Sequence, residues 1–153
     1  MKALHVSNIR TAGGEAAPAE VAEAADASTE ARRAEAKDAN TSTARLLELL
    51  KDKDRWVRIY VAAHPNLPQE QIEALAGHED CLVRAFVARN PKTPETILSR
   101  LADDAHKAVR CFVTQHPHTP PEALAKLAHD REEEVREAVA AHLDTPAKYA
   151  RAP

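Results

Sequence analysis

The sequence predicts an all-α fold, an α-solenoid of two-helix repeats that are 26 residues long and follow a low-complexity N-terminal arm. The first observation is a fixed period, because a Val-Arg pair recurs every 26 residues and Pro residues recur with it. The second is that each period holds two segments with the apolar spacing of an amphipathic helix, while no segment alternates like a β-strand. The pairs are Val57-Arg58, Val83-Arg84, Val109-Arg110 and Val135-Arg136.

The first helix of each unit is predicted from apolar residues at spacing i, i+3 and i+4, which place their side chains on one helical face. In the best preserved unit these residues are Val83, Phe86 and Val87. Pro91 ends this helix, because proline disfavours the helical conformation of the residue before it. The last copy has Ala138 in the aromatic position, so the aromatic residues stop before the end of the array.

The second helix follows a Thr-Pro pair and carries a Leu-x-x-Leu-Ala pattern. Thr119 is predicted to be an N-cap, with Pro120 at the first helical position and Glu122 completing a capping box. Ser42 is predicted to cap the equivalent helix at the start of the array. Helices of about eight to ten residues are not stable alone, so each unit must be stabilised by stacking on its neighbours.

Residues 1–40 differ in composition from the rest of the chain. Alanine and acidic residues dominate, and Val21 is the only larger apolar side chain between positions 12 and 39. Such a segment cannot build a core, so it is expected to be an arm that is flexible or that orders on a partner. The helical repeat domain is then expected to span residues 41–153, with three full repeats and a partial copy at each end.

The composition excludes several classes of protein. The chain has 21 Lys and Arg against 24 Asp and Glu, a formal net charge of -3, so the totals indicate neither a general nucleic-acid binder nor an acidic mimic. No run of about 18 apolar residues is present, so no membrane span is expected. Two cysteines are too few for a disulfide framework, and the N-terminus lacks the apolar region of a signal peptide. A cytoplasmic location is therefore expected.

The repeat resembles the leucine-rich repeat variant family, whose consensus is V-R-x-x-V-A-x-N-P-x-T-P followed by L-x-x-L-A-x-D. Residues 83–94 are VRAFVARNPKTP, and residues 98–104 fit the second part. The resemblance covers about residues 42–149 and implies a right-handed superhelix of alternating α and 3₁₀ helices without catalytic activity. Some members carry an N-terminal iron-sulfur domain, but this chain has no cysteine before Cys81, so no cofactor is expected.

One arginine in each unit follows the core valine, at Arg58, Arg84, Arg110 and Arg136. A line of guanidinium groups along a solenoid can follow a phosphate backbone, which would make the protein a nucleic-acid binder. Alternatively, each arginine pairs with an acid six residues earlier, as Arg110 would with Asp104, to form an internal ladder. Because His78 replaces this acid before Arg84, Arg84 is expected to be the freest of the four.

Histidine or asparagine precedes the first proline of each unit, at His64, Asn90, His116 and His142. Asparagine shares the hydrogen-bonding ability of histidine but not its metal affinity. We therefore expect these side chains to bind helix-end or neighbouring backbone groups, and we expect no metal site. Cys81 and Cys111 lie where other copies carry charge and are expected to be spectator thiols. No catalytic residues are predicted, so the protein is not expected to be an enzyme.

Trp56 is the only tryptophan, and its position holds Leu82, Ala108 and Glu134 in later copies. It is either an interface anchor or a cover for the first helix of the array. The sequence therefore predicts a non-enzymatic interaction or scaffold module that binds a protein through the solenoid surface and the arm. The alternative is nucleic-acid binding along the arginine line. The last copy stops at Tyr149, before a Leu-x-x-Leu-Ala helix, so self-association through an open C-terminal end is also expected.

Overall fold

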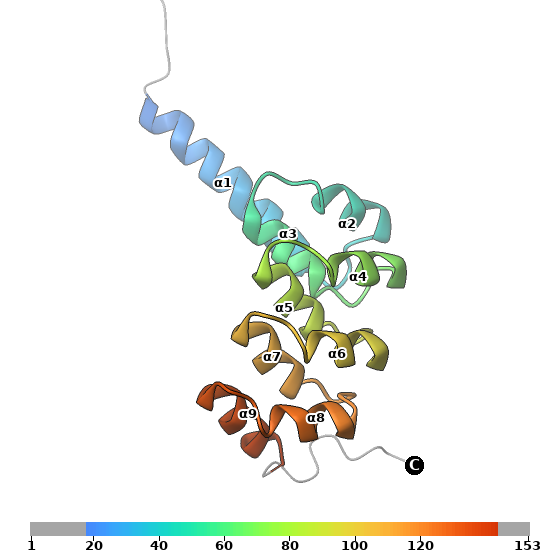
Figure 1. The fold of residues 1–153 in the computed structure, drawn as a ribbon. Coiled ribbons are helices and arrows are strands. Elements are labelled where there is room, and N and C mark those ends of the chain that lie inside the picture. The colour runs from blue at the N-terminus through green and yellow to red at the C-terminus, as the bar shows by residue number, and fades with distance from the viewer. Residues whose placement is uncertain (1–17, 144–153) are drawn as a thin grey trace, which may run out of the picture.

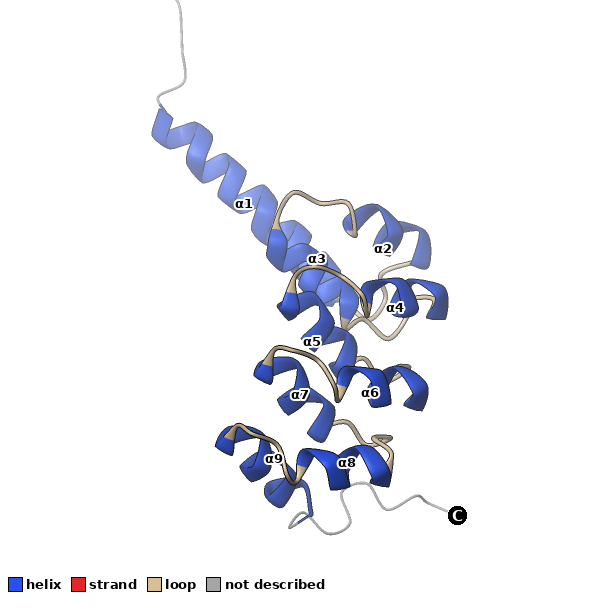
Figure 2. Ribbon diagram, in the orientation of Figure 1, coloured by secondary structure: helices blue, strands red, loops and turns tan. Residues whose placement is uncertain are grey.

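The chain folds into a stack of helix pairs arranged in two columns (Figure 1). A computed structural model describes residues 18–143, with side chains described from residue 28 to residue 142. The described residues contain helices and no strand (Figure 2), which confirms the predicted all-α solenoid. The first column consists of α1 (Pro18–Lys37), α3 (Arg55–Ala62), α5 (Cys81–Arg89), α7 (Lys107–Thr114) and α9 (Glu133–Leu143). The second consists of α2 (Thr43–Leu49), α4 (Gln69–Leu75), α6 (Glu95–Leu101) and α8 (Pro121–Leu127).

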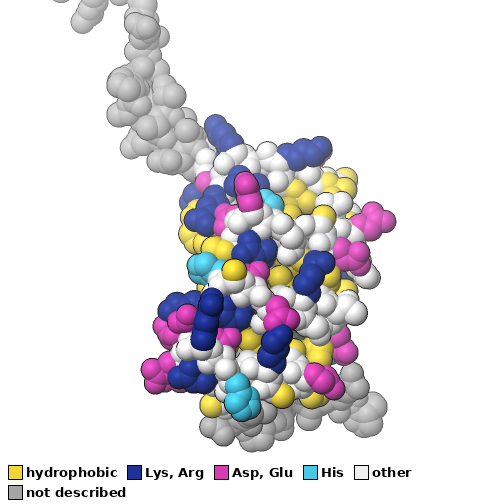
Figure 3. Space-filling view, in the orientation of Figure 1, with side chains coloured by type: hydrophobic (Ala, Val, Ile, Leu, Met, Phe, Trp, Pro, Cys, Tyr) yellow, Lys and Arg dark blue, Asp and Glu magenta, His cyan; other side chains and the backbone are white. Residues whose placement is uncertain are grey.

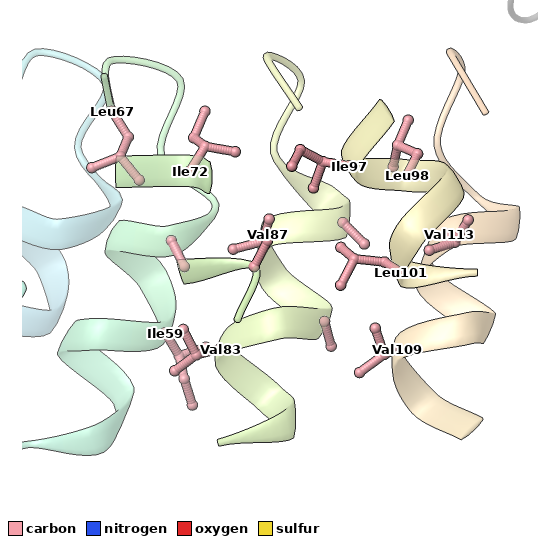
Figure 4. Close-up of a cluster of buried hydrophobic side chains, with 14 of the residues drawn as sticks. Ile59, Leu67, Ile72, Val83, Val87, Ile97, Leu98, Leu101, Val109 and Val113 are labelled. Carbon is pink, nitrogen blue, oxygen red and sulfur yellow. The ribbon is translucent and has the colours of Figure 1, made fainter. Parts of the chain in front are cut away.

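The hydrophobic core lies between successive units. Each helix of the first column packs on the next helix of that column, and each helix of the second column packs on the first-column helix that follows it. Valine, isoleucine and leucine side chains from both columns point into the space between the units (Figure 4). Val83, Val87 and Leu98, for example, are completely buried. The apolar faces predicted from the sequence are therefore the faces that hold the stack together.

The second-column helices are short α-helices of seven residues, as in α6. Their backbone bonds span four residues, because the amide of Leu98 donates to the carbonyl of Pro94 at 3.0 Å and the amide of Ala102 to that of Leu98 at 2.9 Å. The 3₁₀ helices that the resemblance implied are not found among residues 18–143.

The repeated threonine has a different role from the predicted one. The N-cap of α8 is Pro120, and Thr119 lies one residue before it. The Thr119 hydroxyl donates to the carbonyl oxygen of Val113, one of the last carbonyls of α7, which have no amide partner within their own helix. The threonine therefore closes the first helix of the unit instead of opening the second. Ser42 caps α2 as predicted, since its side chain accepts a hydrogen bond from the amide of Arg45.

Helix α1 extends the first column by one more element. It packs on α3, and its Ala36 side chain is completely buried. Arg32 Nε donates to Asp52 Oδ2 at 2.7 Å. Residues 28–37, which belong to the arm predicted over residues 1–40, thus pack on the repeat domain of the same chain. Alanine and arginine favour the helix, and the ion pair docks it without large apolar side chains. Residues 1–17 of the predicted arm lie outside the described residues.

Candidate functional site

The repeated arginines form an internal ladder that joins neighbouring units, and we call this set of ion pairs the arginine ladder. Arg84 Nε and Nη2 donate to Asp104 Oδ2 and Oδ1 at 2.7 and 2.9 Å. Arg110 binds Asp130 in the same way and at the same two distances. Arg32 adds a rung through Asp52, which the sequence analysis missed although Arg32 lies 26 residues before Arg58. Each rung connects an arginine of a first-column helix to an aspartate in the turn after the next second-column helix.

The partners in this ladder differ from the predicted ones. Asp104, six residues before Arg110, offers Arg110 its backbone carbonyl, which accepts from Nη1 at 2.8 Å. Its carboxylate binds Arg84 instead. Arg84 is therefore in a bidentate ion pair with only 16% of its side chain exposed, and the prediction that it is the freest arginine is wrong. Arg58 has no aspartate in the corresponding position, because the residue twenty positions later is His78.

In the rungs of Arg84 and Arg110, each arginine and its aspartate neutralise one another's charge. The Arg110 guanidinium lowers the pKa of Asp130. Burial opposes the ionisation of Asp104, but the hydrogen bonds from Arg84 and from the amide of His106 outweigh it and lower the Asp104 pKa. Figure 3 shows basic and acidic side chains interspersed over the viewed face of the stack, with no continuous basic stripe. Two of the four arginines on which nucleic-acid binding would depend, Arg84 and Arg110, are therefore already paired with carboxylates of the same chain.

The other two predicted arginines are anchored only through backbone carbonyls. Arg58 Nη1 donates to the carbonyl of Asp52 at 2.7 Å, and Arg136 Nη1 donates to the carbonyl of Asp130 at the same distance. Arg58 is half-buried and Arg136 is exposed. Among the described residues, neither guanidinium has a carboxylate within the 4.0 Å of an ion pair. These two arginines keep N–H groups that no carboxylate of the described residues occupies.

The histidine and asparagine positions form a second ladder, made of neutral hydrogen bonds. His64 Nε2 binds the carbonyl of Asp38 at 2.8 Å, Asn90 Nδ2 binds the carbonyl of His64 at 2.9 Å, and His116 Nε2 binds the carbonyl of Asn90 at 3.0 Å. The other ring nitrogen of His116, Nδ1, accepts from the amide of His118 at 3.1 Å. This confirms that these side chains satisfy the backbone of the neighbouring repeat, and it leaves His116 no nitrogen for a metal.

We expect His116 to make the stability of the stack fall as the pH drops below about 6.5. Burial lowers the pKa of His116, so the unfolded chain binds the proton before the folded one does. The stabilisation is thus fully present above the pKa of the unfolded chain and is lost as the pH falls below it. His116→Asn installs the residue that occupies this position at Asn90. Urea unfolding should show that the free energy of unfolding falls less between about pH 7.5 and about pH 5.5 in His116→Asn than in the wild type. An equal fall in the two proteins would show that His116 does not cause the pH dependence.

A line of aromatic rings runs along the first column, and we call Trp56, Tyr60, Phe86 and Phe112 the aromatic row. The ring centroids of Trp56 and Tyr60 are 6.1 Å apart, those of Tyr60 and Phe86 are 6.4 Å apart, and those of Phe86 and Phe112 are 5.9 Å apart. Trp56 remains 41% exposed, and the other three rings are half-buried. The tryptophan is therefore stacked on one side and accessible on the other.

Two cations that the sequence analysis missed lie over this row. Lys37 Nζ is 4.8 Å from the centroid of the Tyr60 ring. Arg89 Cζ is 5.1 Å from the centroid of Phe86 and 5.7 Å from that of Phe112. Both side chains are exposed, and neither forms an ion pair with a carboxylate of the described part of the chain. No repeat signal marks them, because the equivalent positions hold Ala63 and Gln115.

Two apolar hollows lie elsewhere on the stack. One of about 590 Å³ lies between α2 and α4 and is lined by Leu47, Leu50 and Leu75 together with polar side chains. The other, of about 260 Å³, lies between α8 and α9 beside Leu124 and Val139. Residues 144–153, on which the predicted self-association through the C-terminal end depends, lie outside the described residues.

Other kinds of site find little support in the described part of the chain. No group of three or more His, Cys, Asp or Glu side chains there is placed to hold a metal ion. Cys81 and Cys111 are free and half-buried, and burial raises the pKa of the Cys111 thiol, which disfavours the reactive thiolate. None of the described helices is long and apolar enough to cross a membrane.

Comparison with known proteins agrees with the repeat geometry. The model of the leucine-rich repeat variant family matches three consecutive segments, residues 55–80, 82–106 and 108–132. These segments contain α3 to α8, with the aromatic row and the rungs at Arg84 and Arg110. No curated protein and no solved structure gives a significant match to the chain. The three matched segments follow one another in the register found here, and the chain belongs to the leucine-rich repeat variant family.

Proposed function

We propose that this helical repeat module is a non-enzymatic interaction module that binds a protein partner through the aromatic row and its two cations. The observation that carries the proposal is Trp56, which is 41% exposed although its ring packs against that of Tyr60, with the ring centroids 6.1 Å apart. Tryptophan, tyrosine and arginine are the residues most enriched among those that dominate binding energy at protein interfaces. A rigid ring that is already stacked also loses little conformational freedom on binding.

The charge of this surface indicates the kind of partner. Lys37 and Arg89 hold two exposed positive charges over the rings, without carboxylates from the described residues. A partner segment that combines apolar side chains with acidic ones would cover the rings and pair with these cations. The hollow beside Leu47 is a second apolar surface, but its lining lacks aromatic residues. The aromatic row is therefore the better supported contact.

The N-terminal arm belongs to the same proposal as a second contact. Removing all of residues 1–40 does not test it, because that deletion also removes the part of α1 that packs on α3. A deletion of residues 1–17 leaves the described helices in place and tests the arm alone. Nucleic-acid binding is not favoured by the structure, because Arg84 and Arg110 are both held in ion pairs.

Trp56→Ala and Arg89→Ala should each weaken binding to the partner by about thirtyfold if these residues are interface anchors. Both side chains are largely on the surface, so each change should lower the free energy of unfolding much less than truncation of a core residue does. The full chain is used to capture its partner from the native cell, the partner is identified by mass spectrometry, and its affinity for each variant is measured by titration calorimetry. Leu47→Ala is the matched control, since Leu47 is 37% exposed but lies on α2. Loss of binding in Leu47→Ala alone would move the interface to the hollow beside α2.

A further inference from the structure

In the unit of Arg58, a histidine stands where the units of Arg84 and Arg110 have the carboxylate. Arg58 is held as the other ladder arginines are, because its Nη1 donates to two backbone carbonyls at 2.7 and 3.1 Å, against 2.7 and 3.0 Å for Arg84. This anchoring fixes the direction of the guanidinium group. In Arg84 and Arg110 the remaining edge, Nε with Nη2, binds both oxygens of an aspartate. At Arg58 the residue in the aspartate position is His78.

His78 takes over only part of the role of the aspartate. Its Nδ1 accepts a hydrogen bond from the amide of Asp80 at 3.0 Å, just as Asp104 Oδ1 accepts from the amide of His106 at 2.9 Å. The proton of the neutral ring is therefore on Nε2, which is a donor and offers Arg58 no acceptor. The position that supplies negative charge in the other rungs supplies none here.

The acidic side chain two residues after His78 is already engaged. Asp80 accepts from Arg55 Nε and Nη2 at 2.6 and 2.7 Å, and its Oδ1 also accepts from the amide of Leu82 at 2.9 Å. Arg58 and His78 are both half-buried, so part of each side chain is exposed to solvent. The result is an oriented, partly exposed guanidinium edge in a rung whose aspartate position holds a histidine donor.

We propose that Arg58 and His78 form a binding site for a carboxylate group, which the Nε and Nη2 groups of Arg58 hold as a bidentate pair. The ligand class follows from the neighbouring rungs, in which the same guanidinium edge holds a carboxylate at 2.7 and 2.9 Å. The carboxylate is an acidic side chain of the protein partner, and this part of the inference rests on the proposed function. The partner thus completes the ladder at the unit where the chain leaves it open.

Acetate is the probe that tests the site without the partner. In the full-length chain, acetate should produce a saturable shift of the Arg58 side-chain Nε–Hε signal in nitrogen NMR, while the signals of Arg84 and Arg110 stay in place. His78→Asp supplies an internal carboxylate, so it should abolish the acetate shift and raise the unfolding temperature. Asp104→His opens a second rung, so an acetate shift should appear at Arg84 as well as at Arg58. The site is refuted if Arg58 does not respond, if all arginines respond alike, or if the response survives in His78→Asp.

The source of the carboxylate is tested with the captured partner. His78→Asp should weaken partner binding at least tenfold although it stabilises the fold, and it leaves the aromatic row untouched. If His78→Asp binds the partner as the wild type does while Trp56→Ala does not, the partner does not supply the carboxylate and that assignment is overturned. The proposed function would stand in that case. It would fall only if the variants of the aromatic row bound normally.

Discussion

Replacing Asp130 with alanine is expected to lower the free energy of unfolding by about 3–5 kcal/mol, the usual cost of removing one member of a buried ion pair. Asp130 accepts hydrogen bonds from Nε and Nη2 of Arg110. The Asp130 and Arg110 side chains are only 8% and 6% exposed. Without the carboxylate, the Arg110 guanidinium remains buried and unpaired. Asp130 Oδ1 also accepts from the amide of Glu132 at 2.9 Å, so the turn before α9 loses a bond as well. Urea unfolding followed by circular dichroism measures the loss.

The control for this variant is Asp103→Ala. Asp103 pairs with Lys126, but both side chains are 60% exposed, so the loss should be less than about 1 kcal/mol. Because Arg110 lowers the pKa of Asp130, the stabilisation from this pair is present above the ordinary aspartate pKa of about 3.9 and is lost as the pH falls below it. If Asp130→Ala and Asp103→Ala lowered the free energy of unfolding equally at neutral pH, burial of the Arg110–Asp130 pair would not make its loss more costly.

Leu98→Ala is expected to destabilise the stack by about 3 kcal/mol and to lower the unfolding temperature by about 10 °C. Leu98 lies on α6 and is completely buried in the core between two units (Figure 4). Truncation removes apolar contacts and leaves a cavity that the surrounding helices fill only in part. Differential scanning calorimetry of the full chain gives the unfolding temperature directly.

The comparison for Leu98→Ala is the same substitution at Leu47, which is 37% exposed. Its cost should be less than about 1 kcal/mol, because more than a third of the side chain is already exposed to water. If the two leucines had similar effects, the stack would not depend on the rows of apolar residues between its units.

The repeat and its apolar faces could be predicted from the sequence because both are periodic. The partner of each arginine could not, for a reason that lies in the period itself. In a 26-residue repeat, the residue six positions before Arg110 and the residue twenty positions after it occupy the same place in the unit, since 26 − 6 = 20. Asp104 and Asp130 are therefore equivalent in the pattern, and only the packing of one unit on the next decides between them.

Helix α1 was assigned to the arm for a different reason. At the positions of Val57 and Ile59 it has Ala31 and Arg33, so the apolar signal of the repeat is absent from it. Arg33 instead pairs with Asp54 at 2.9 Å, and charged contacts replace the missing apolar area. A contact that occurs in only one unit produces no pattern that repeats along the sequence. The cations over the aromatic row escaped prediction for the same reason.

The neutral ladder also bears on how long such a stack can become. His64, Asn90 and His116 each donate to a main-chain carbonyl, a group that every amino acid carries. The joint therefore accepts any neighbour with the correct backbone path, whatever its side chains. In-frame gain or loss of a whole 26-residue unit leaves no donor orphaned. The number of units is therefore free to change without loss of these hydrogen bonds.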